Sequence, residues 1–262
     1  MSTVAITDAV KKYDAVAALD GVTMTFQEGE FFGLLGPSGS GKTTLLRAIA
    51  GFVTLDRGQV LIDGQDVGGV PVHARNIGMM FQNYALFPHL NVEKNVGFGL
   101  RQEKLPRAEI AERVDAMLAL VRLQEYRKRR IDQLSGGQKQ RVALARALST
   151  EPEVLLMDEP FAALDAQTRD LLHDELERIW AETGRTIVFV THNVREAVRL
   201  GDRVVLLTYR PGRVKKEFLV DLPRPRQLEE VEVAHAARQI LDELREEINK
   251  SLEAEYRHEK AN

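Results

Sequence analysis

The stretch from Glu30 to Gly51, EFFGLLGPSGSGKTTLLRAIAG, decides the fold of this chain. It opens with EFFGLLG, a short apolar run that ends in glycine, which is typical of a buried strand leading into a loop. Residues 42–52 have the pattern of a helix, and we expect this helix to stop at Gly51. Between strand and helix, Gly36–Thr43 fits G-x-x-x-x-G-K-[ST], the pattern of a phosphate-binding loop, in the context that the pattern requires.

The residues of this loop suit phosphate chemistry. Glycines let the backbone curl so that successive N–H groups point inward, and the helix that follows adds the positive end of its dipole. We expect Lys42 to reach the β and γ phosphates of a nucleotide, and the hydroxyl of Thr43 to bind Mg²⁺. A glycine turn with a chance lysine is the alternative.

Strand patterns return in the second half of the chain. They cover residues 153–160, 185–193 and 202–214, with a helix predicted for 166–183 between the first two. Strands that alternate with helices indicate an α/β fold with a mostly parallel sheet. Together with the phosphate loop, this pattern predicts a phosphate-loop NTPase core.

Three candidate site residues lie where these strands end. In an open α/β sheet, ligands collect at the carboxyl ends of strands. We therefore expect Asp158 to be an outer partner of Mg²⁺ and Glu159 to polarise an attacking water. His192 ends the next strand, where an imidazole can touch a γ-phosphate oxygen and sense its presence. Two acids that only solvate a strand end, and a structural histidine, are the alternatives.

Two further side chains suit a nucleotide site. Gln82 carries a neutral amide that can donate to water and ligate Mg²⁺, which fits a contact that forms and breaks with the nucleotide state. Tyr13 lies near the start of the sheet and can stack on an adenine face. A surface amide and plain aromatic packing are the respective alternatives.

The remaining segments predict two additions to the core and a C-terminal helix. Residues 4–13 and 21–30 alternate as strands, and 58–67 is typical of a hairpin with Asp63-Gly64 at its turn, so we expect an N-terminal antiparallel β subdomain. Helical periodicity follows from Asn91 to Leu148 and predicts a helical insertion at about residues 88–148. Within it, the apolar positions of 107–123 fall on one face of a helix.

The last segment, residues 228–255, is charged and helical. Its apolar residues Ile240, Leu244, Ile248 and Leu252 repeat on one side. We expect this helix to pack against the rest of the chain or to mediate dimer contacts.

The composition is that of a soluble globular protein. The chain has 262 residues, of which 44% are hydrophobic and 29% charged, and its net charge of -3 predicts no general attraction to nucleic acid or acidic lipid. The absence of cysteine excludes disulfides and thiolate metal sites. No signal peptide is recognisable, and no apolar run approaches the roughly 20 residues that span a bilayer, so a cytoplasmic location is expected.

A second glycine pair lies far from the phosphate loop, in DQLSGGQKQRVALARAL at residues 132–148. Gly136 and Gly137 precede a predicted helix, so Ser135 and the first free N–H groups form an anion site without an attached lysine. A head-to-tail homodimer with two-fold symmetry would set residues 135–138 of one chain against the nucleotide of the other. An ordinary glycine N-cap is the alternative.

LSGGQ at residues 134–138, with the KQRVALARAL that follows, resembles the signature sequence of ATP-binding cassette (ABC) ATPases. The other motifs of that family lie in the expected order: Tyr13, the phosphate loop, Gln82, the signature, VLLMDEP, ALD at 163–165 and His192. The resemblance covers about residues 4–220. It implies ATP hydrolysis by a sandwich dimer, in which ATP joins the signature loops to the phosphate loops and which opens after hydrolysis.

The resemblance also implies a role for each residue of the site. Phosphate and Mg²⁺ are held by Gly36, Ser38, Gly39, Gly41, Lys42, Thr43 and Thr44, and Tyr13 meets the adenine. Gln82 and Asp158 complete the metal environment. Glu159 is the implied catalytic base, and His192 the implied γ-phosphate switch.

Other implied roles concern the second subunit. Ser135, Gly137 and Gln138 act in trans, on the nucleotide of the partner. Asp165 belongs to the loop that crosses the dimer seam. The family often has serine where this chain has Ala162 or Ala163, and Asn193 replaces the commoner acid after the histidine.

The expected partners are two transmembrane permease subunits, which would hold the ATPase at the cytoplasmic face of the inner or plasma membrane. Residues 83–100 carry Tyr84, Leu86, Phe87 and Leu90, which we expect to be exposed as a groove for a partner helix, with a core role as the alternative. In the family, this region resembles the surface that receives a cytoplasmic coupling helix of the permease. An importer also implies a solute-binding protein, whereas no nucleic-acid partner is expected.

The substrate is the least defined feature. Residues 201–226 resemble the ATPase subunits of nitrate, sulfonate, taurine and bicarbonate importers, so a small anion is our main expectation. Residues 86–100 instead resemble polyamine, iron or sugar importers. A polyamine, iron or other small-solute importer, an exporter and a soluble ABC ATPase are the alternatives. By this reading, residues 1–226 form the ABC ATPase domain and 227–262 a C-terminal extension.

Overall fold

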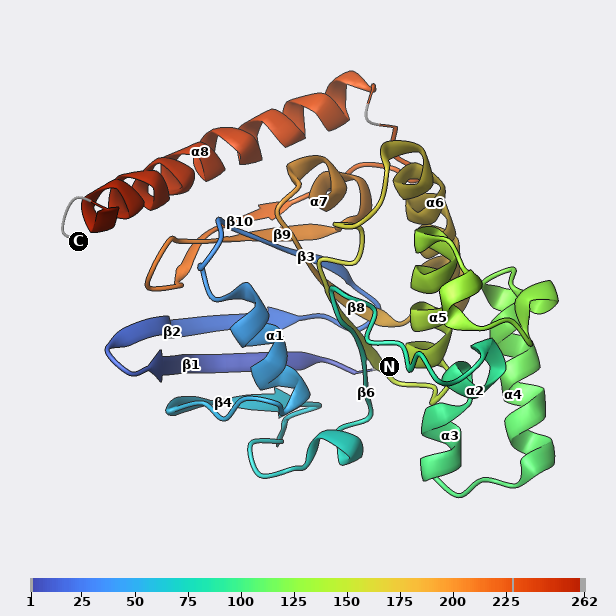
Figure 1. The fold of residues 1–262 in the computed structure, drawn as a ribbon. Coiled ribbons are helices and arrows are strands. Elements are labelled where there is room, and N and C mark those ends of the chain that lie inside the picture. Colours follow the sequence, from blue (N-terminus) through green and yellow to red (C-terminus); the bar gives the residue numbers. More distant parts are fainter. Residues whose placement is uncertain (1, 228, 260–262) are drawn as a thin grey trace. The chain divides into compact units, whose positions relative to one another are not determined.

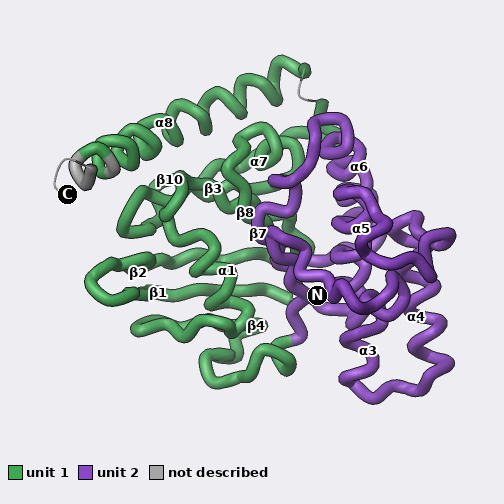
Figure 2. Tube along the Cα trace, viewed as in Figure 1, with its two compact units in different colours: residues 1–75, 186–262 green, residues 76–185 purple. Residues whose placement is uncertain are grey.

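The computed structural model describes residues 2–227 and 229–259. The chain divides into two compact units: residues 1–75 together with 186–262 form unit 1, and residues 76–185 form unit 2 (Figure 2). Leu228, the first residue of the predicted C-terminal helical segment, lies outside the described residues, as do Met1 and residues 260–262.

An antiparallel sheet forms the first part of unit 1 (Figure 1). Its strands, in sheet order, are β2 (Val16–Phe26), β1 (Val4–Tyr13), β4 (Arg57–Ile62) and β5 (Gln65–Asp66). Ile62 pairs with Gln65, and the two residues between them, Asp63 and Gly64, have φ values of 50° and 76°. Two consecutive positive φ values characterise a tight hairpin turn, so the predicted hairpin is confirmed.

The second sheet of unit 1 is mainly parallel. The strands of this sheet that belong to unit 1 are, in sheet order, β10 (Val214–Leu219), β9 (Arg203–Leu207), β3 (Phe31–Leu35) and β8 (Thr186–Thr191). Every residue of β3 and β8 is buried, as expected for parallel strands covered on both faces. The strand pattern predicted for 202–214 is divided: β9 ends at Leu207, a turn follows, and β10 begins at Val214 and pairs antiparallel to β9.

Among the described residues of unit 1, three helices accompany these sheets. They are α1 (Lys42–Ala50), α7 (Val194–Leu200) and α8 (Val231–Glu259), and a short 3-10 turn covers Val72–Ala74. Gly51 ends α1 with a φ of 88°, and its N–H bonds to the carbonyl of Ala48, so the predicted helix stop is confirmed.

Helix α8 lies against α7 (Figure 1) and buries only part of its apolar side. Ile240 and Leu244 are buried, with 1% and 4% of their surface exposed, as the predicted helix face requires. Ile248 and Leu252, one and two turns further on, are 37% and 48% exposed. Of these four apolar residues, only the first two are thus packed in the core, although Glu247 and Ser251 further along the helix are also buried.

Unit 2 consists of two parallel strands and a group of helices. The strands are β6 (Ile77–Met80) and β7 (Val154–Asp158), and the helices are α2 (Val92–Val96), α3 (Phe98–Gln102), α4 (Arg107–Leu120), α5 (Gly136–Leu148) and α6 (Ala166–Thr183). Short 3-10 turns cover Gln124–Tyr126 and Ile131–Gln133. Helices α2 to α5 lie within the predicted insertion, and α6 has the predicted bounds. The apolar face of α4 is narrower than expected, because its buried residues are only Val114 and Leu118.

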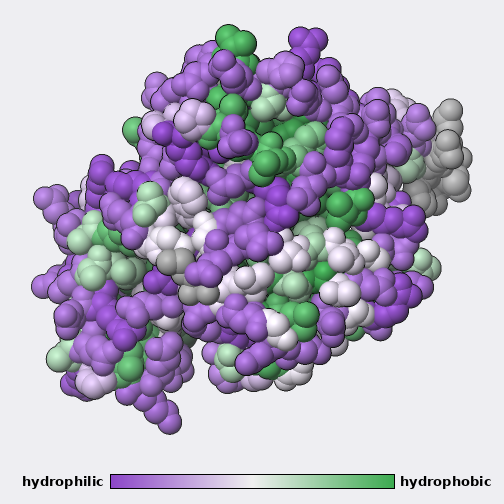
Figure 3. Space-filling view, turned by 180° about the vertical axis from the view of Figure 1, so that it is seen from behind, coloured by the Kyte–Doolittle hydropathy of each residue, from purple (hydrophilic) through white to green (hydrophobic). Residues whose placement is uncertain are grey.

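One face of the molecule is mainly polar (Figure 3). Figure 3 shows this face, on which hydrophilic residues dominate and apolar residues form small groups. Within residues 2–227 and 229–259, none of the helices combines the length and the apolar character that crossing a membrane requires.

Candidate nucleotide site

The phosphate loop connects β3 to α1 in unit 1. Gly39 and Gly41 adopt left-handed conformations, with φ values of 77° and 84°. At Gly41 a Cβ atom would lie 2.5 Å from the carbonyl oxygen of Ala18, so glycine is needed there for its conformation and for its contact. Gly41 is also the N-cap of α1 and supplies no side chain to the first N–H groups of the helix. These N–H groups face the loop and fit an anion.

Lys42 lies inside the curl of the loop. Its side chain is buried, and Nζ donates to the carbonyl oxygens of Gly36 and Pro37, at 2.8 Å each, and to Oγ of Ser40 at 3.3 Å. Thr43 follows in the first turn of α1 and is half-buried, as is Thr44, whereas Ser38 and Gly39 are exposed at the tip of the loop. The loop thus has the backbone and the cation that the predicted phosphate site requires.

His192 emerges beside this loop. Strands β3 and β8 run parallel, and Leu35 pairs with Thr191, so Gly36 and His192 leave neighbouring strands at the same edge of the sheet. The imidazole is exposed, as a side chain that meets a ligand must be. Its predicted proximity to the phosphate loop within unit 1 follows from this register.

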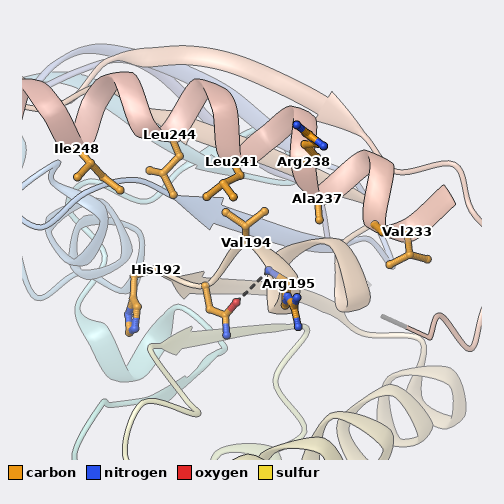
Figure 4. Close-up of a pocket in the computed structure, with 11 residues that line it drawn as sticks. His192, Val194, Arg195, Val233, Ala237, Arg238, Leu241, Leu244 and Ile248 are labelled. Carbon is orange, nitrogen blue, oxygen red and sulfur yellow. Dashed lines mark hydrogen bonds between the residues drawn. The ribbon is translucent and has the colours of Figure 1, made fainter. Parts of the chain in front are cut away.

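The segment after His192 is fixed by Asn193, the N-cap of α7. Its side chain accepts a hydrogen bond from the N–H of Arg195 at 3.0 Å. Figure 4 shows His192 pointing away from α8 and Val194 pointing toward it. A groove of about 500 Å³ separates this segment from α8, lined by residues that include Val194, Leu241, Leu244 and Ile248. Helix α8 therefore borders the loop that carries His192.

Tyr13 ends β1 and is 47% exposed. The ammonium of Lys11 lies 5.6 Å from the centre of its ring. The structure does not favour plain packing for Tyr13, because almost half of the side chain is open to solvent. Its stacking on adenine stays a prediction.

Unit 2 brings together two of the predicted residues, Gln82 and Glu159. Nε2 of Gln82 donates a hydrogen bond of 3.1 Å to Oε2 of Glu159. Gln82 follows β6 and Glu159 follows β7, and these parallel strands pair Met80 with Met157. Glu159 has a φ of 47°, a left-handed conformation that is strained for a residue with a side chain and is often found at functional sites. Asp158 precedes it and is buried.

The second glycine pair forms the start of α5, with Ser135 as the N-cap. Oγ of Ser135 accepts from the N–H of Gln138 at 3.3 Å, and Oε1 of Gln138 accepts from the N–H of Ser135 at 2.9 Å. This reciprocal capping box differs from the glycine N-cap that was the alternative from the sequence, because the cap is the side chain of Ser135. Gly137 allows a close approach to α6, because a Cβ atom there would lie 2.7 Å from Cγ2 of Thr168. Ser135 is exposed, Gln138 is half-buried and Gly137 is buried, and the action of these three residues in trans stays a prediction.

Asp165 is the N-cap of α6. Its carboxylate accepts from the backbone N–H of Thr168 at 2.9 Å and from Oγ1 of the same residue at 2.7 Å. These two hydrogen bonds lower the pKa of Asp165. Ala162 and Ala163, at positions where the family often has a serine, are exposed.

The predicted exposed groove after Gln82 is wrong in one residue. Tyr84 is buried, its hydroxyl has no hydrogen-bond partner within the described chain, and burial raises its pKa. Leu86, Phe87 and Leu90 are half-buried. Tyr84 is buried because the backbone of residues 84–91 is hydrogen-bonded to Asn95 and Arg146. Neither residue was identified in this role from the sequence.

Asn95 is one of these missed residues. It is fully buried, and its Oδ1 accepts from the N–H of Phe87 at 2.9 Å. Its Nδ2 donates to the carbonyls of Phe87, Leu90 and Asn91, at 3.1, 3.2 and 3.0 Å. In the sequence, an asparagine in a helical pattern is indistinguishable from a surface amide.

Arg146 is the second of these missed residues. It lies on α5, the signature helix, and donates to the carbonyls of Tyr84 and Ala85, at 2.8 and 2.6 Å. Its guanidinium lies 5.5 Å from the ring centre of Phe87, and burial lowers its pKa. The signature helix is thus bound directly to the segment that follows Gln82.

Comparison with known proteins identifies the family. The model of the family described as "ABC transporter" matches residues 19–162. The putrescine transport ATP-binding protein PotG of Escherichia coli is 52% identical over 202 residues, which cover 77% of this chain and 54% of that protein. The chain therefore spans about half the length of this relative.

Two other relatives are covered more fully. An ABC transporter ATP-binding protein of Methanocaldococcus jannaschii is 48% identical over 237 residues, 90% of this chain and 88% of that protein. The sulfate/thiosulfate import ATP-binding protein CysA of Caulobacter vibrioides is 51% identical over 218 residues, 82% of this chain and 64% of that protein. These names do not single out the nitrate, sulfonate, taurine and bicarbonate group that residues 201–226 indicated.

A solved structure agrees with the fold. The dimeric ATP-binding cassette MJ0796, in a post-hydrolysis state with ADP and phosphate, is 32% identical and superposes with a TM-score of 0.75, covering 84% of this chain and 100% of that one. This likeness confirms the predicted phosphate-loop α/β fold with its antiparallel subdomain. The chain belongs to the ABC transporter family of ATPases.

Proposed function

We propose that this chain is the ATP-hydrolysing subunit of an importer for a small solute, and that it works as a head-to-tail homodimer. The observation that carries the proposal is the phosphate loop, in which Lys42 is enclosed by the curl that Gly39 and Gly41 make possible. The uncapped N-terminus of α1 adds N–H donors at the same place. A triphosphate matches this combination of cation and donors.

In this proposal, the loop and Lys42 bind the β and γ phosphates. Mg²⁺, held by Thr43, Gln82 and Asp158, would neutralise charge on these phosphates. Glu159 orients a water and accepts its proton, with the hydrogen bond from Gln82 fixing the carboxylate.

His192 and Tyr13 contribute from unit 1. His192 leaves the same sheet edge as the loop and touches the γ phosphate, so it registers hydrolysis. The exposed ring of Tyr13 stacks on adenine.

The partner subunit completes the site with Ser135, Gly137 and Gln138. A hydroxyl can accept and donate at the same time. The hydroxyl oxygen of Ser135 can therefore keep accepting the hydrogen bond from Gln138 while its O–H donates a hydrogen bond to the γ phosphate held by the other subunit. The likeness to a dimeric cassette supports this arrangement.

In this proposal, ATP hydrolysis by the dimer drives conformational change in two permease subunits, which the dimer contacts at the cytoplasmic face of the membrane. A solute-binding protein delivers the solute. The segment from Gln82 to Asn95 suits this contact, because it starts at the residue that binds Glu159 and is fixed by Arg146 of the signature helix. Relatives named for putrescine and for sulfate or thiosulfate favour a polyamine, sulfate or another small solute over nitrate, sulfonate, taurine or bicarbonate.

Phosphate release from ATP tests the catalytic part. The purified chain should release phosphate in the presence of Mg²⁺, and Lys42→Ala should not; equal release by both proteins would contradict the proposal. Uptake of labelled putrescine and of labelled sulfate, by cells that lack this chain and by complemented cells, tests the substrate. Complementation that restores uptake of nitrate or taurine alone would overturn the substrate proposal.

A further inference from the structure

An arginine outside the recognised motifs lies against the phosphate loop. Arg210 belongs to the turn between β9 and β10. A Cβ atom at Gly39 would lie 3.0 Å from Nε and 3.1 Å from Nη2 of Arg210, so the guanidinium occupies the space that the glycine leaves open. Turn and loop both belong to unit 1.

The guanidinium of Arg210 is available for a ligand. It forms no hydrogen bond or ion pair with any residue that the structure describes, and its side chain is exposed. Its nearest aromatic contact is the ring of Tyr209, at 5.9 Å from the ring centre. By contrast, Arg213 of the same turn is paired with Asp20. Arg210 is therefore an unneutralised cation at the edge of an anion site.

The turn that carries Arg210 is anchored on the side of β2. The N–H of Gly212 donates to the carbonyl of Ala18 at 3.1 Å, and the N–H of Asp20 donates to the carbonyl of Gly212 at 3.0 Å. Gly212 also packs directly on the phosphate loop, because a Cβ atom there would lie 2.2 Å from the carbonyl oxygen of Ser40. The turn is thus hydrogen-bonded to β2 and lies in close contact with the phosphate loop.

Helix α8 anchors the other side of the turn through Glu247. This carboxylate is fully buried, and its Oε2 accepts from the N–H of Tyr209 at 2.8 Å. Its Oε1 meets the ammonium groups of Lys250 and Lys215. The backbone beside Arg210 is therefore held by the C-terminal helix.

We propose that Arg210 is a further phosphate-binding residue of the nucleotide site, and that Glu247 of α8 positions it. The ligand is a nucleoside di- or triphosphate, whose negative charges exceed what Lys42 alone neutralises. A guanidinium presents two parallel N–H donors to phosphate oxygens, which a lone ammonium does not. The proposal rests on the proposed function of the loop, to which it adds one ligand and one positioning residue.

Binding of ADP with Mg²⁺ by the full chain, measured by calorimetry, tests the role of Arg210. Arg210→Ala should weaken binding about 10-fold, the usual effect of losing one charged hydrogen bond, and Arg210→Lys should recover part of the loss. Arg47→Ala, which removes the same charge from the exposed far end of α1, should bind like the parent chain. Lys42→Ala separates the two proposals: if it binds normally, the proposed function fails. If it does not bind while Arg210→Ala binds within about twofold of the parent, only the role of Arg210 fails.

A double-mutant cycle tests the positioning by Glu247. Glu247→Ala removes the acceptor for the N–H of Tyr209 and should weaken ADP binding, whereas Glu247→Gln keeps an acceptor and should restore it. Because Glu247 acts through Arg210, Glu247→Ala should have no further effect in a chain that already carries Arg210→Ala. Additive losses would contradict the positioning role, and so would unchanged binding by a folded Glu247→Ala chain, with folding checked by circular dichroism.

Discussion

The amide of Gln82 donates a hydrogen bond to the carboxylate of Glu159, with 3.1 Å between Nε2 and Oε2. The two residues follow the parallel strands β6 and β7, whose register brings both strand ends to one edge. The proposed base is thus held by the residue proposed to contact the metal. A change at Gln82 reaches Glu159 through a single hydrogen bond.

Replacing Gln82 by alanine should lower kcat for ATP hydrolysis roughly 10-fold, because the carboxylate of Glu159 loses the contact that orients it. Binding of ATP should change much less, since the phosphate loop is untouched. Steady-state phosphate release gives both quantities. Asn83→Ala, at the exposed neighbouring position, is the control and should behave like the parent chain. A kcat that survives the loss of Gln82 would refute the orienting role.

Asn95→Ala should destabilise the chain by about 2–4 kcal/mol, because several buried backbone groups lose their partner at once. The midpoint of urea unfolding measures the effect. Lys94→Ala, which removes the adjacent exposed side chain of α2, should stay within about 0.5 kcal/mol of the parent. Equal effects at the two positions would show that Asn95 does not hold the segment from Phe87 to Asn91.

A matched pair on α8 tests how much of this helix is packed. Leu244 is 4% exposed and Leu252 is 48% exposed. Leu244→Ala should therefore cost about 2–4 kcal/mol of unfolding free energy, and Leu252→Ala less than about 0.5 kcal/mol. A large loss at Leu252 would mean that this side chain is covered in solution, for example in a dimer.

Glu247 predicts how the stability of unit 1 depends on pH. Burial alone would raise its pKa, but hydrogen bonds from Lys250, the N–H of Tyr209 and Lys215 outweigh burial and leave the pKa below its ordinary value of 4.5. A depressed pKa means that the carboxylate contributes stability that is fully present above pH 4.5 and is lost as the pH falls through the folded-state pKa.

The measurement is the free energy of unfolding between neutral pH and pH 3. The parent chain should lose more stability below pH 4.5 than Glu247→Gln does, because the amide does not titrate. Parallel curves for the two proteins would contradict a charged Glu247 in the folded state.

The predictability of the structure follows from how local each feature is. The phosphate loop, the stop of α1 at Gly51 and the bounds of α6 depend on neighbouring residues, so the sequence predicts them. Tyr84 was expected at the surface, because its burial depends on Arg146, which is far away in the chain. The division of residues 202–214 into two strands and a turn likewise depends on partners in β2 and α8.

The candidate site divides in the same way. Residue types and their order were sufficient to nominate Lys42, Glu159 and His192, because each lies in a short, recognisable motif. Asn95 and Glu247 could not be found, because an amide or a carboxylate in a charged helix has no distinguishing pattern until its buried partners are known. Ser135 belongs to both groups. Its capping role depends on neighbouring residues, whereas its proposed role in trans depends on a second chain.

The central claim is that two copies of this chain build each nucleotide site together. The chain contains no cysteine, so single cysteines can be introduced without background. Glu159→Gln, which should slow hydrolysis about 100-fold or more while leaving binding intact, provides a chain that keeps its ATP. Copies that also carry Ser38→Cys are mixed with copies that carry Ser135→Cys, and a short thiol cross-linker is added.

With ATP and Mg²⁺, the two chains should cross-link rapidly. No cross-link should form without nucleotide, or when Thr54→Cys, an exposed position elsewhere in unit 1, replaces Ser38→Cys. Absence of the cross-link at saturating ATP, in chains shown to bind it, would contradict the composite site.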